Sequence, residues 1–168
     1  MPRFAIAFVR IVDRMNYGVG RMAMYLLFVL MAILMWSAIS KAVSTPSLWT
    51  LEMAQFVMVA YFVLGGPYAM QMGSHVRMDL FYAKQSPVRQ AWWDAFTVFA
   101  LVFYLGVMLW GAIDSTIYAV SFNERSPTAW RPYMWPIKVI LCIGFLLMLL
   151  QAISALIRDI ATIRGEPI

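Results

Sequence analysis

The most distinctive polar residues of this sequence lie in one short run, Gly73–Leu80, which contains His75, Arg77 and Asp79. In a helix, His75 and Asp79 share a face while Arg77 turns away; in an extended chain, all three side chains project to one side. Either geometry makes a compact polar cluster. Charges at the end of an apolar stretch also commonly reach for lipid headgroups, so the run is equally consistent with a partner contact and with a membrane-boundary role.

Two further acids, Glu52 and Asp114, lie at the edges of long apolar stretches. An acid is tolerated there when it is hydrated or paired, whereas at mid-depth in a membrane it is expensive, so neither residue predicts a buried proton relay. Glu52 is also favourable as a first-turn charge at a helix N-terminus. We expect Glu52, His75, Arg77 and Asp79 to be structural or partner-interface residues.

Several kinds of chemistry are excluded by what the sequence lacks. The single cysteine, Cys142, allows neither an internal disulfide nor a thiolate metal site, and the single histidine excludes a haem held by two histidines. The sequence has no phosphate-binding Walker loop, no HExxH, no GxSxG and no dinucleotide-binding glycine motif. We therefore expect no enzymatic activity, no catalytic residue, no cofactor and no metal.

The composition is that of a membrane protein. Of 168 residues, 63% are apolar and only 12% are charged, and the mean hydropathy is +0.76. A soluble domain of this size needs more polar surface. The 13 Lys and Arg residues are scattered between long uncharged stretches and do not form one basic face, so no nucleic-acid binding is expected.

Four stretches are long enough to cross a bilayer, whose apolar core of about 30 Å requires about 20 helical residues. They cover roughly residues 22–41, 50–73, 92–115 and 135–157. Lipid satisfies no backbone hydrogen bond, and the stretches lack the alternating polarity of barrel strands, so all four are predicted to be helices. The expected fold is an all-α integral membrane protein, an up-and-down bundle that forms a single domain over residues 1–168.

The positive charges predict the orientation. Nine Lys and Arg residues lie before the first span, between the second and third, and after the fourth, whereas four lie on the opposite side. The positive-inside rule then places both termini in the cytoplasm. Tryptophans favour the headgroup layer and agree with this arrangement: five lie at the predicted outer ends (Trp36, Trp49, Trp110, Trp130 and Trp135) and two at the inner face (Trp92 and Trp93).

Two segments are predicted to lie in the membrane interface, residues 3–16 and residues 74–88. Four arginines near the N-terminus, spaced seven, four and seven residues apart, share one helical face, which leaves an apolar set to face the acyl boundary: Phe4, Phe8, Ile11, Val12 and Met15. This pattern predicts an amphipathic helix attracted to anionic phospholipids, with a disordered basic leader as the alternative. Pro87 is expected to close the second segment before a helix begins near Trp92. The first span is longer than a signal-peptide core and lacks a clean A-x-A site, so we expect it to be retained.

Three groups of residues are distinctive: Trp49–Glu52 at the start of the second span, Gly65–Gly66 within it and, most specifically, Gly73–Leu80 at its inner end. In these groups the chain resembles, over most of its length, the small membrane subunit (DctQ-like) of tripartite ATP-independent periplasmic (TRAP) transporters. A weaker match consists of Pro136 and Lys138 at the start of the fourth span and of Gly144 and Gln151 further along it.

The resemblance implies a secondary transporter of the bacterial inner membrane in three parts: this subunit, a larger DctM-like membrane subunit and a periplasmic substrate-binding protein. The large subunit is expected to carry the transport site and to move an organic acid with sodium, while this subunit is a non-catalytic scaffold. Carboxylates such as 2-oxo acids or C4-dicarboxylates are the expected substrates. No transport or sodium residue of the family is carried over to this chain.

Two other functions remain open. A self-sufficient four-helix exporter needs an acid at mid-depth, and transport by the chain alone in liposomes would identify it. A membrane anchor of a respiratory complex would co-purify with haem or quinone. Co-purification of a large permease would exclude the second alternative.

Overall fold

The computed structural model describes residues 3–43, 45–73 and 87–164 of the chain. Within them lie four helices: α1 (Arg3–Ala42), α2 (Thr50–Gln71), α4 (Pro87–Ser121) and α5 (Trp135–Arg164). All four are long and apolar enough to cross a membrane. Extended structure in these residues is confined to one isolated bridge, between Arg125 and Tyr133. The prediction of an all-helical protein with four spanning helices is confirmed.

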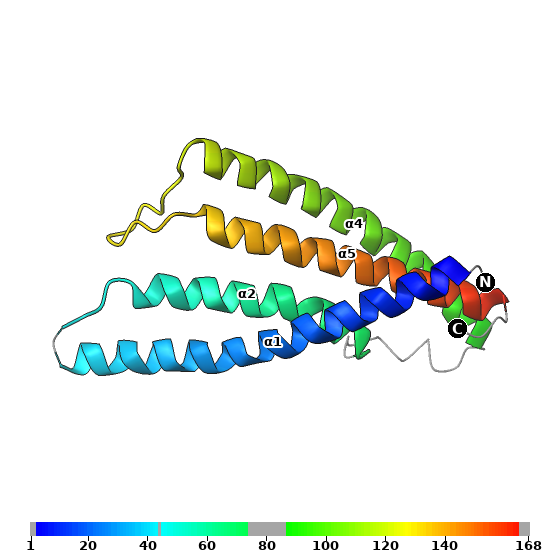
Figure 1. The fold of residues 1–168 in the computed structure, drawn as a ribbon, viewed down its shortest axis with the longest axis horizontal. Coiled ribbons are helices and arrows are strands. Elements are labelled where there is room, and N and C mark those ends of the chain that lie inside the picture. Colours follow the sequence, from blue (N-terminus) through cyan, green and yellow to red (C-terminus); the bar gives the residue numbers. More distant parts are fainter. Residues whose placement is uncertain (1–2, 44, 74–86, 165–168) are drawn as a thin grey trace.

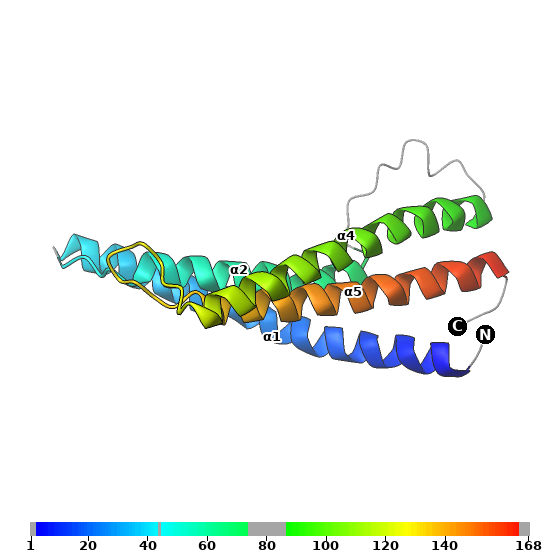
Figure 2. The same ribbon diagram turned by 90° about the horizontal axis from the view of Figure 1, so that it is seen from above.

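The helices form two antiparallel hairpins, α1 with α2 and α4 with α5 (Figure 1). We call the end with the connections 43–49 and 122–134 the hairpin end, and the end with the start of α1 and the close of α5 the terminal end. α5 packs against α2 and α1, while α4 packs against α5 (Figure 2). Among the described residues α4 makes no comparable contact with α1 or α2, so the predicted bundle is open on that side. This arrangement suits lipid, where apolar faces need no burial.

The helices differ in length relative to the bilayer. With 22 residues, α2 measures about 33 Å at 1.5 Å per residue, close to the thickness of the apolar core. α1 has 40 residues, and α1, α4 and α5 all extend past the end of α2 at the terminal end (Figures 1 and 2). α4 begins at Pro87, earlier than expected, because proline is well accommodated in the first helical turn. Residues 87–88 of the predicted interfacial segment are therefore helical.

The N-terminal segment 3–16 is helical, but it is continuous with the first span. Val12, expected to face the acyl boundary, is only 3% exposed and packs inside the terminal end, so that expectation is wrong. The reason is α5, which packs alongside α1 and covers a face that the pattern of α1 alone left open. Phe4 and Ile11 are exposed as expected. The position of this segment relative to the membrane stays a prediction.

Glycines allow the closest contacts between helices. A Cβ at Gly144 of α5 would overlap the Val63 side chain of α2 and lie 3.1 Å from the Val63 carbonyl oxygen. That carbonyl has no helical N–H partner, because Pro67, four residues later, carries none. Gly20 of α1 lies similarly close to Tyr68 of α2. Thus α2 runs unbroken through Pro67, held between α1 and α5.

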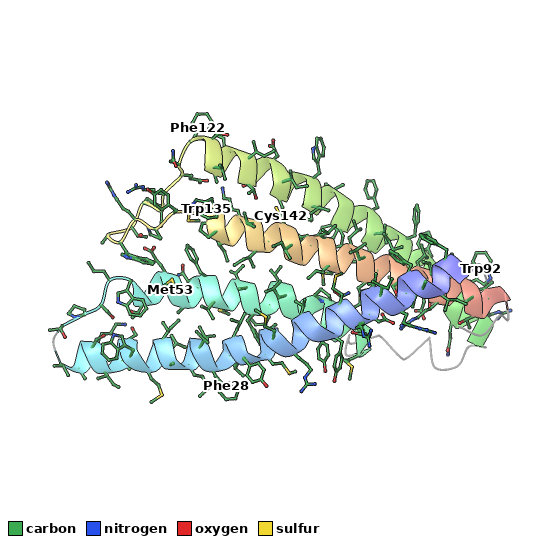
Figure 3. The ribbon with its side chains drawn as sticks, in the orientation of Figure 1. Phe28, Met53, Trp92, Phe122, Trp135 and Cys142 are labelled. Carbon is green, nitrogen blue, oxygen red and sulfur yellow. The ribbon has the colours of Figure 1, made fainter. Side chains whose placement is uncertain are left out.

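Large apolar side chains point mostly outward along the helices (Figure 3). All seven tryptophans are at least 38% exposed. Trp92 lies at the terminal end, while Phe122 and Trp135 lie at the hairpin end (Figure 3). Exposed aromatic residues toward both ends and small buried residues such as Ala119 and Ala152 between helices are typical of a membrane protein.

Candidate functional site

Of the four predicted site residues, the structure describes Glu52. This residue lies in the first turn of α2, is 8% exposed, and its Oε2 accepts no hydrogen bond from the described residues. The positive end of the helix dipole favours its charge, but an enclosed carboxylate oxygen also needs a donor. His75, Arg77 and Asp79 lie outside the described residues, so their arrangement stays a prediction.

A hydroxyl cluster, consisting of Ser37, Ser40, Ser47 and Thr50, closes the α1–α2 hairpin. Ser47 Oγ lies 3.1 Å from both Ser40 Oγ and Thr50 Oγ1, and Thr50 Oγ1 lies 3.2 Å from Ser37 Oγ. A hydroxyl can both donate and accept, so these four side chains can serve as partners for one another. Residues two apart in a helix point about 200° from one another, so Glu52 turns away from the face that carries Thr50.

The α4–α5 hairpin is closed by an ion pair. Lys138 Nζ donates to Glu124 Oε2 at 2.5 Å and to the Ser115 carbonyl oxygen at 3.4 Å. Beside it, the Arg125 guanidinium lies 4.3 Å from the centre of the Tyr133 ring. Glu124 thus has a basic partner, whereas Glu52 Oε2, at the same end of the molecule, has no donor in the part of the chain that the structure describes.

A larger polar cluster joins three helices at the terminal end. The terminal-end cluster consists of Asp13 and Asn16 of α1, Gln71 of α2, and Gln151, Ser154 and Arg158 of α5. Arg158 pairs with Asp13 Oδ2, and Gln151 Nε2 donates to Asp13 Oδ1 at 3.1 Å. Asn16 Nδ2 donates to Gln151 Oε1 at 2.6 Å, and Gln71 Nε2 donates to the Asp13 carbonyl oxygen at 3.3 Å. Asn16 and Gln151 are 1% and 2% exposed, so the cluster is a buried link between the helices.

Most of this cluster was missed by sequence reasoning. Gln151 belongs to the weaker part of the family resemblance, but nothing in the sequence pairs it with Asn16, 135 positions away. A signal was nevertheless present: polar side chains inside or beside apolar spans are expensive unless they bond to another helix. Asp13, Asn16 and Gln151 all fit that description.

The chemistry that these groups support is association between helices. The residues that the structure describes contain no group of three His, Cys, Asp or Glu side chains that could hold a metal ion. The hydroxyl cluster joins α1 to α2, Lys138 and Glu124 close the second hairpin, and the terminal-end cluster joins α1, α2 and α5. Contacts of this kind hold the helices in fixed positions.

These features define a multi-span membrane protein whose four helices are joined by glycine contacts and by polar clusters at both ends. Comparison with known protein families matches residues 13–162 to the DctQ component of tripartite ATP-independent periplasmic transporters. The chain belongs to this family and is a small membrane subunit of a TRAP transporter, which confirms the resemblance seen in the sequence. Comparisons with curated proteins and with solved structures gave no match.

Proposed function

We propose that this chain is the non-catalytic scaffold of a TRAP transporter that imports a carboxylate with sodium. The observation that carries the proposal is the absence of any charged residue from the apolar stretches 22–40, 53–74, 95–113 and 139–157. Secondary transporters bind substrate and ion near the bilayer midplane through polar side chains and broken helices. A DctM-like large subunit is therefore expected to carry the transport site, and a periplasmic binding protein to deliver the substrate.

The proposed setting is the bacterial inner membrane, with both termini in the cytoplasm and residues 1–168 as one domain. The excess of basic residues before the first span, between the second and third, and after the fourth supports this orientation. Arg10, Arg14 and Arg21 are exposed along α1 near the terminal end, where anionic phospholipid would attract them. The segments 3–16 and 74–88 are proposed to lie in that interface.

Glu52 is our candidate for a contact with the large subunit. Its Oε2 has no donor among the described residues, whereas Glu124, at the same end, is paired with Lys138. An unpaired, enclosed carboxylate is unfavourable, and a basic or hydroxyl group brought by a partner would remove that penalty. Assembly of the complex would then satisfy Glu52.

Exchange of Glu52 for glutamine is expected to weaken association with the large subunit about tenfold, which corresponds to about 1.4 kcal/mol. The side chain keeps its size but loses the charge that strengthens a hydrogen bond. Binding of the purified large subunit to the variant in nanodiscs measures the effect. The thermal stability of the isolated Glu52→Gln chain should not fall, because Oε2 accepts no hydrogen bond from the described residues.

Glu124→Gln is the matched control, since it removes the charge of an acid that already has a partner, Lys138. It should lower the stability of the isolated chain slightly and leave association with the large subunit unchanged. Equal affinity of Glu52→Gln and the unmodified chain for the large subunit would remove Glu52 from the interface.

Charge reversal at Arg77 or Asp79 is expected to lower the yield of the complex with the large subunit. These residues belong to the run that carries most of the family resemblance, and a reversed charge at a packed interface is repelled by the group that matched it. Co-purification of the two membrane subunits measures the yield. The affinity of the periplasmic protein for its substrate should stay the same, and full assembly of both variants would contradict the interface role.

A further inference from the structure

In the terminal-end cluster, the donors follow one another toward the Asp13 carboxylate, which is the final acceptor. Asp13 accepts from Arg158 and from Gln151 Nε2, so the Gln151 amide must turn its Oε1 toward Asn16. Asn16 Nδ2 donates to that oxygen and lies 3.5 Å from the Leu147 carbonyl, which is also an acceptor. The carboxylate therefore sets the orientation of both amides. Because Asn16 uses its Nδ2 toward Gln151, its Oδ1 points away from Gln151 and is left without a donor among the described residues.

Three oxygen atoms of the cluster accept no hydrogen bond from the described residues. They are Asn16 Oδ1, Gln71 Oε1 and Ser154 Oγ, and each is enclosed. Flipping the Asn16 amide would set its oxygen against two acceptors, and flipping Gln71 would set its oxygen against the Asp13 carbonyl. Amide reorientation therefore leaves the acceptors unsatisfied, and a hydrogen-bond donor from outside the described residues would satisfy them.

Ser154 differs from three threonines in the helices of the same protein. Thr97, Thr116 and Thr162 each donate to the carbonyl four residues earlier, the usual solution for a hydroxyl in an apolar helix. Ser154, which is fully buried on α5 between Gln151 and Arg158, makes no such bond. Its hydroxyl is thus free to bond within the cluster.

We propose that the terminal-end cluster is a hydration site, which holds at least one ordered water molecule donating to Asn16 Oδ1 and bridging to Gln71 or Ser154. A buried water is stable where two to four polar partners surround it, and the cluster offers three unsatisfied oxygen atoms as candidate partners. The depth is also suitable, because Gln71 closes α2, whose length matches the bilayer core. Water at this level lies next to the aqueous boundary.

The consequence is structural. A water-bridged cluster lets α1, α2 and α5 share one polar link at the membrane boundary without an unpaired acceptor. Among the described residues of the cluster, only Asp13 and Arg158 are charged, and their opposite charges offset each other. A donor of two hydrogen bonds, and not a cation, is therefore the expected occupant.

The two asparagines of the chain, Asn16 and Asn123, make a direct test possible. With asparagine labelled by ¹⁵N, water-edited solid-state NMR of the full chain in bilayers reports magnetisation transfer from water to two side-chain amides. Asn123 is exposed in the 122–134 loop and is the reference. We expect the magnetisation transferred from water to the Asn16 side-chain amide to build up at a rate within about twofold of the rate at Asn123, although Asn16 is buried. A rate more than fivefold slower would overturn the proposal.

Two further experiments test whether water or a cation occupies the site. Replacing sodium by N-methylglucamine in the buffer should leave the Asn16 signal unchanged, and a sodium-dependent shift would assign the site to a cation instead. Ser154→Ala should slow the water transfer to Asn16 and lower the melting temperature, whereas Ser115→Ala, which removes an exposed hydroxyl, should do neither. A higher melting temperature for Ser154→Ala would show that the hydroxyl is buried dry, and would contradict the hydration site.

Discussion

Replacement of Gly144 by alanine is expected to lower the free energy of unfolding of the isolated chain by about 1–3 kcal/mol, the usual cost of overpacking a close contact. The new methyl group would overlap the Val63 side chain and press on its carbonyl oxygen at 3.1 Å. The side chain of Val63 can rotate, but its backbone cannot move without shifting α2. Equilibrium unfolding in mixed micelles measures the loss.

The matched control for this substitution is Gly106→Ala in α4. A Cβ at Gly106 meets nothing within 4 Å, so the isolated chain should be unaffected or gain up to about 1 kcal/mol from a better helix former. Equal effects of the two substitutions would show that the contact between α2 and α5 is not as close as described. Loss of complex with Gly106→Ala, at unchanged stability of the chain, would place that face of α4 in the interface.

Removal of the Asp13 carboxylate is expected to be the most damaging change at the terminal end. In Asp13→Ala, the buried amide of Gln151 loses its acceptor and Arg158 loses its ion pair. A buried donor left without a partner costs about 1–3 kcal/mol, and the pair adds little because the Arg158 side chain is 43% exposed. We therefore expect a loss of about 2 kcal/mol, together with greater proteolysis at the start of α1.

Asp114→Ala is the control, because this acid is exposed on α4 and its loss should change stability by less than about 0.5 kcal/mol. Asp13→Asn gives a second comparison. It retains an oxygen acceptor for Gln151 but weakens the bond to Arg158, so an intermediate loss is expected. If Asp13→Ala were as stable as the unmodified chain, the terminal-end cluster would not hold α1 to α5.

The spanning helices and the family were accessible from the sequence because each depends on local information. Uninterrupted apolar length predicts a span, and the run from Gly73 to Leu80 is a contiguous pattern. Gly144 and Gln151 were part of a weak match without a stated role. The structure supplies one for each: Gly144 lies against Val63, and Gln151 bonds to Asp13 and Asn16.

Features that depend on contacts between distant segments were not accessible in this way. The periodicity of α1 predicted an arginine face and an apolar face, but it could not predict that Val12 is buried, because α5 packs alongside α1. The start of α4 at Pro87 was missed because proline both ends segments and begins helices. Glu52 was recognised as a residue of interest from its position, while the finding that its Oε2 has no donor among the described residues required the packed structure.

The most direct test of the scaffold role is sodium-driven uptake of a carboxylate into proteoliposomes, with the matching periplasmic binding protein supplied outside. Vesicles that contain both membrane subunits should accumulate substrate, and vesicles that contain this chain alone should show no uptake above protein-free vesicles. Coupled uptake by the chain alone would contradict the account, because it would require a route for solute and ion through helices that carry no charged residue at mid-depth.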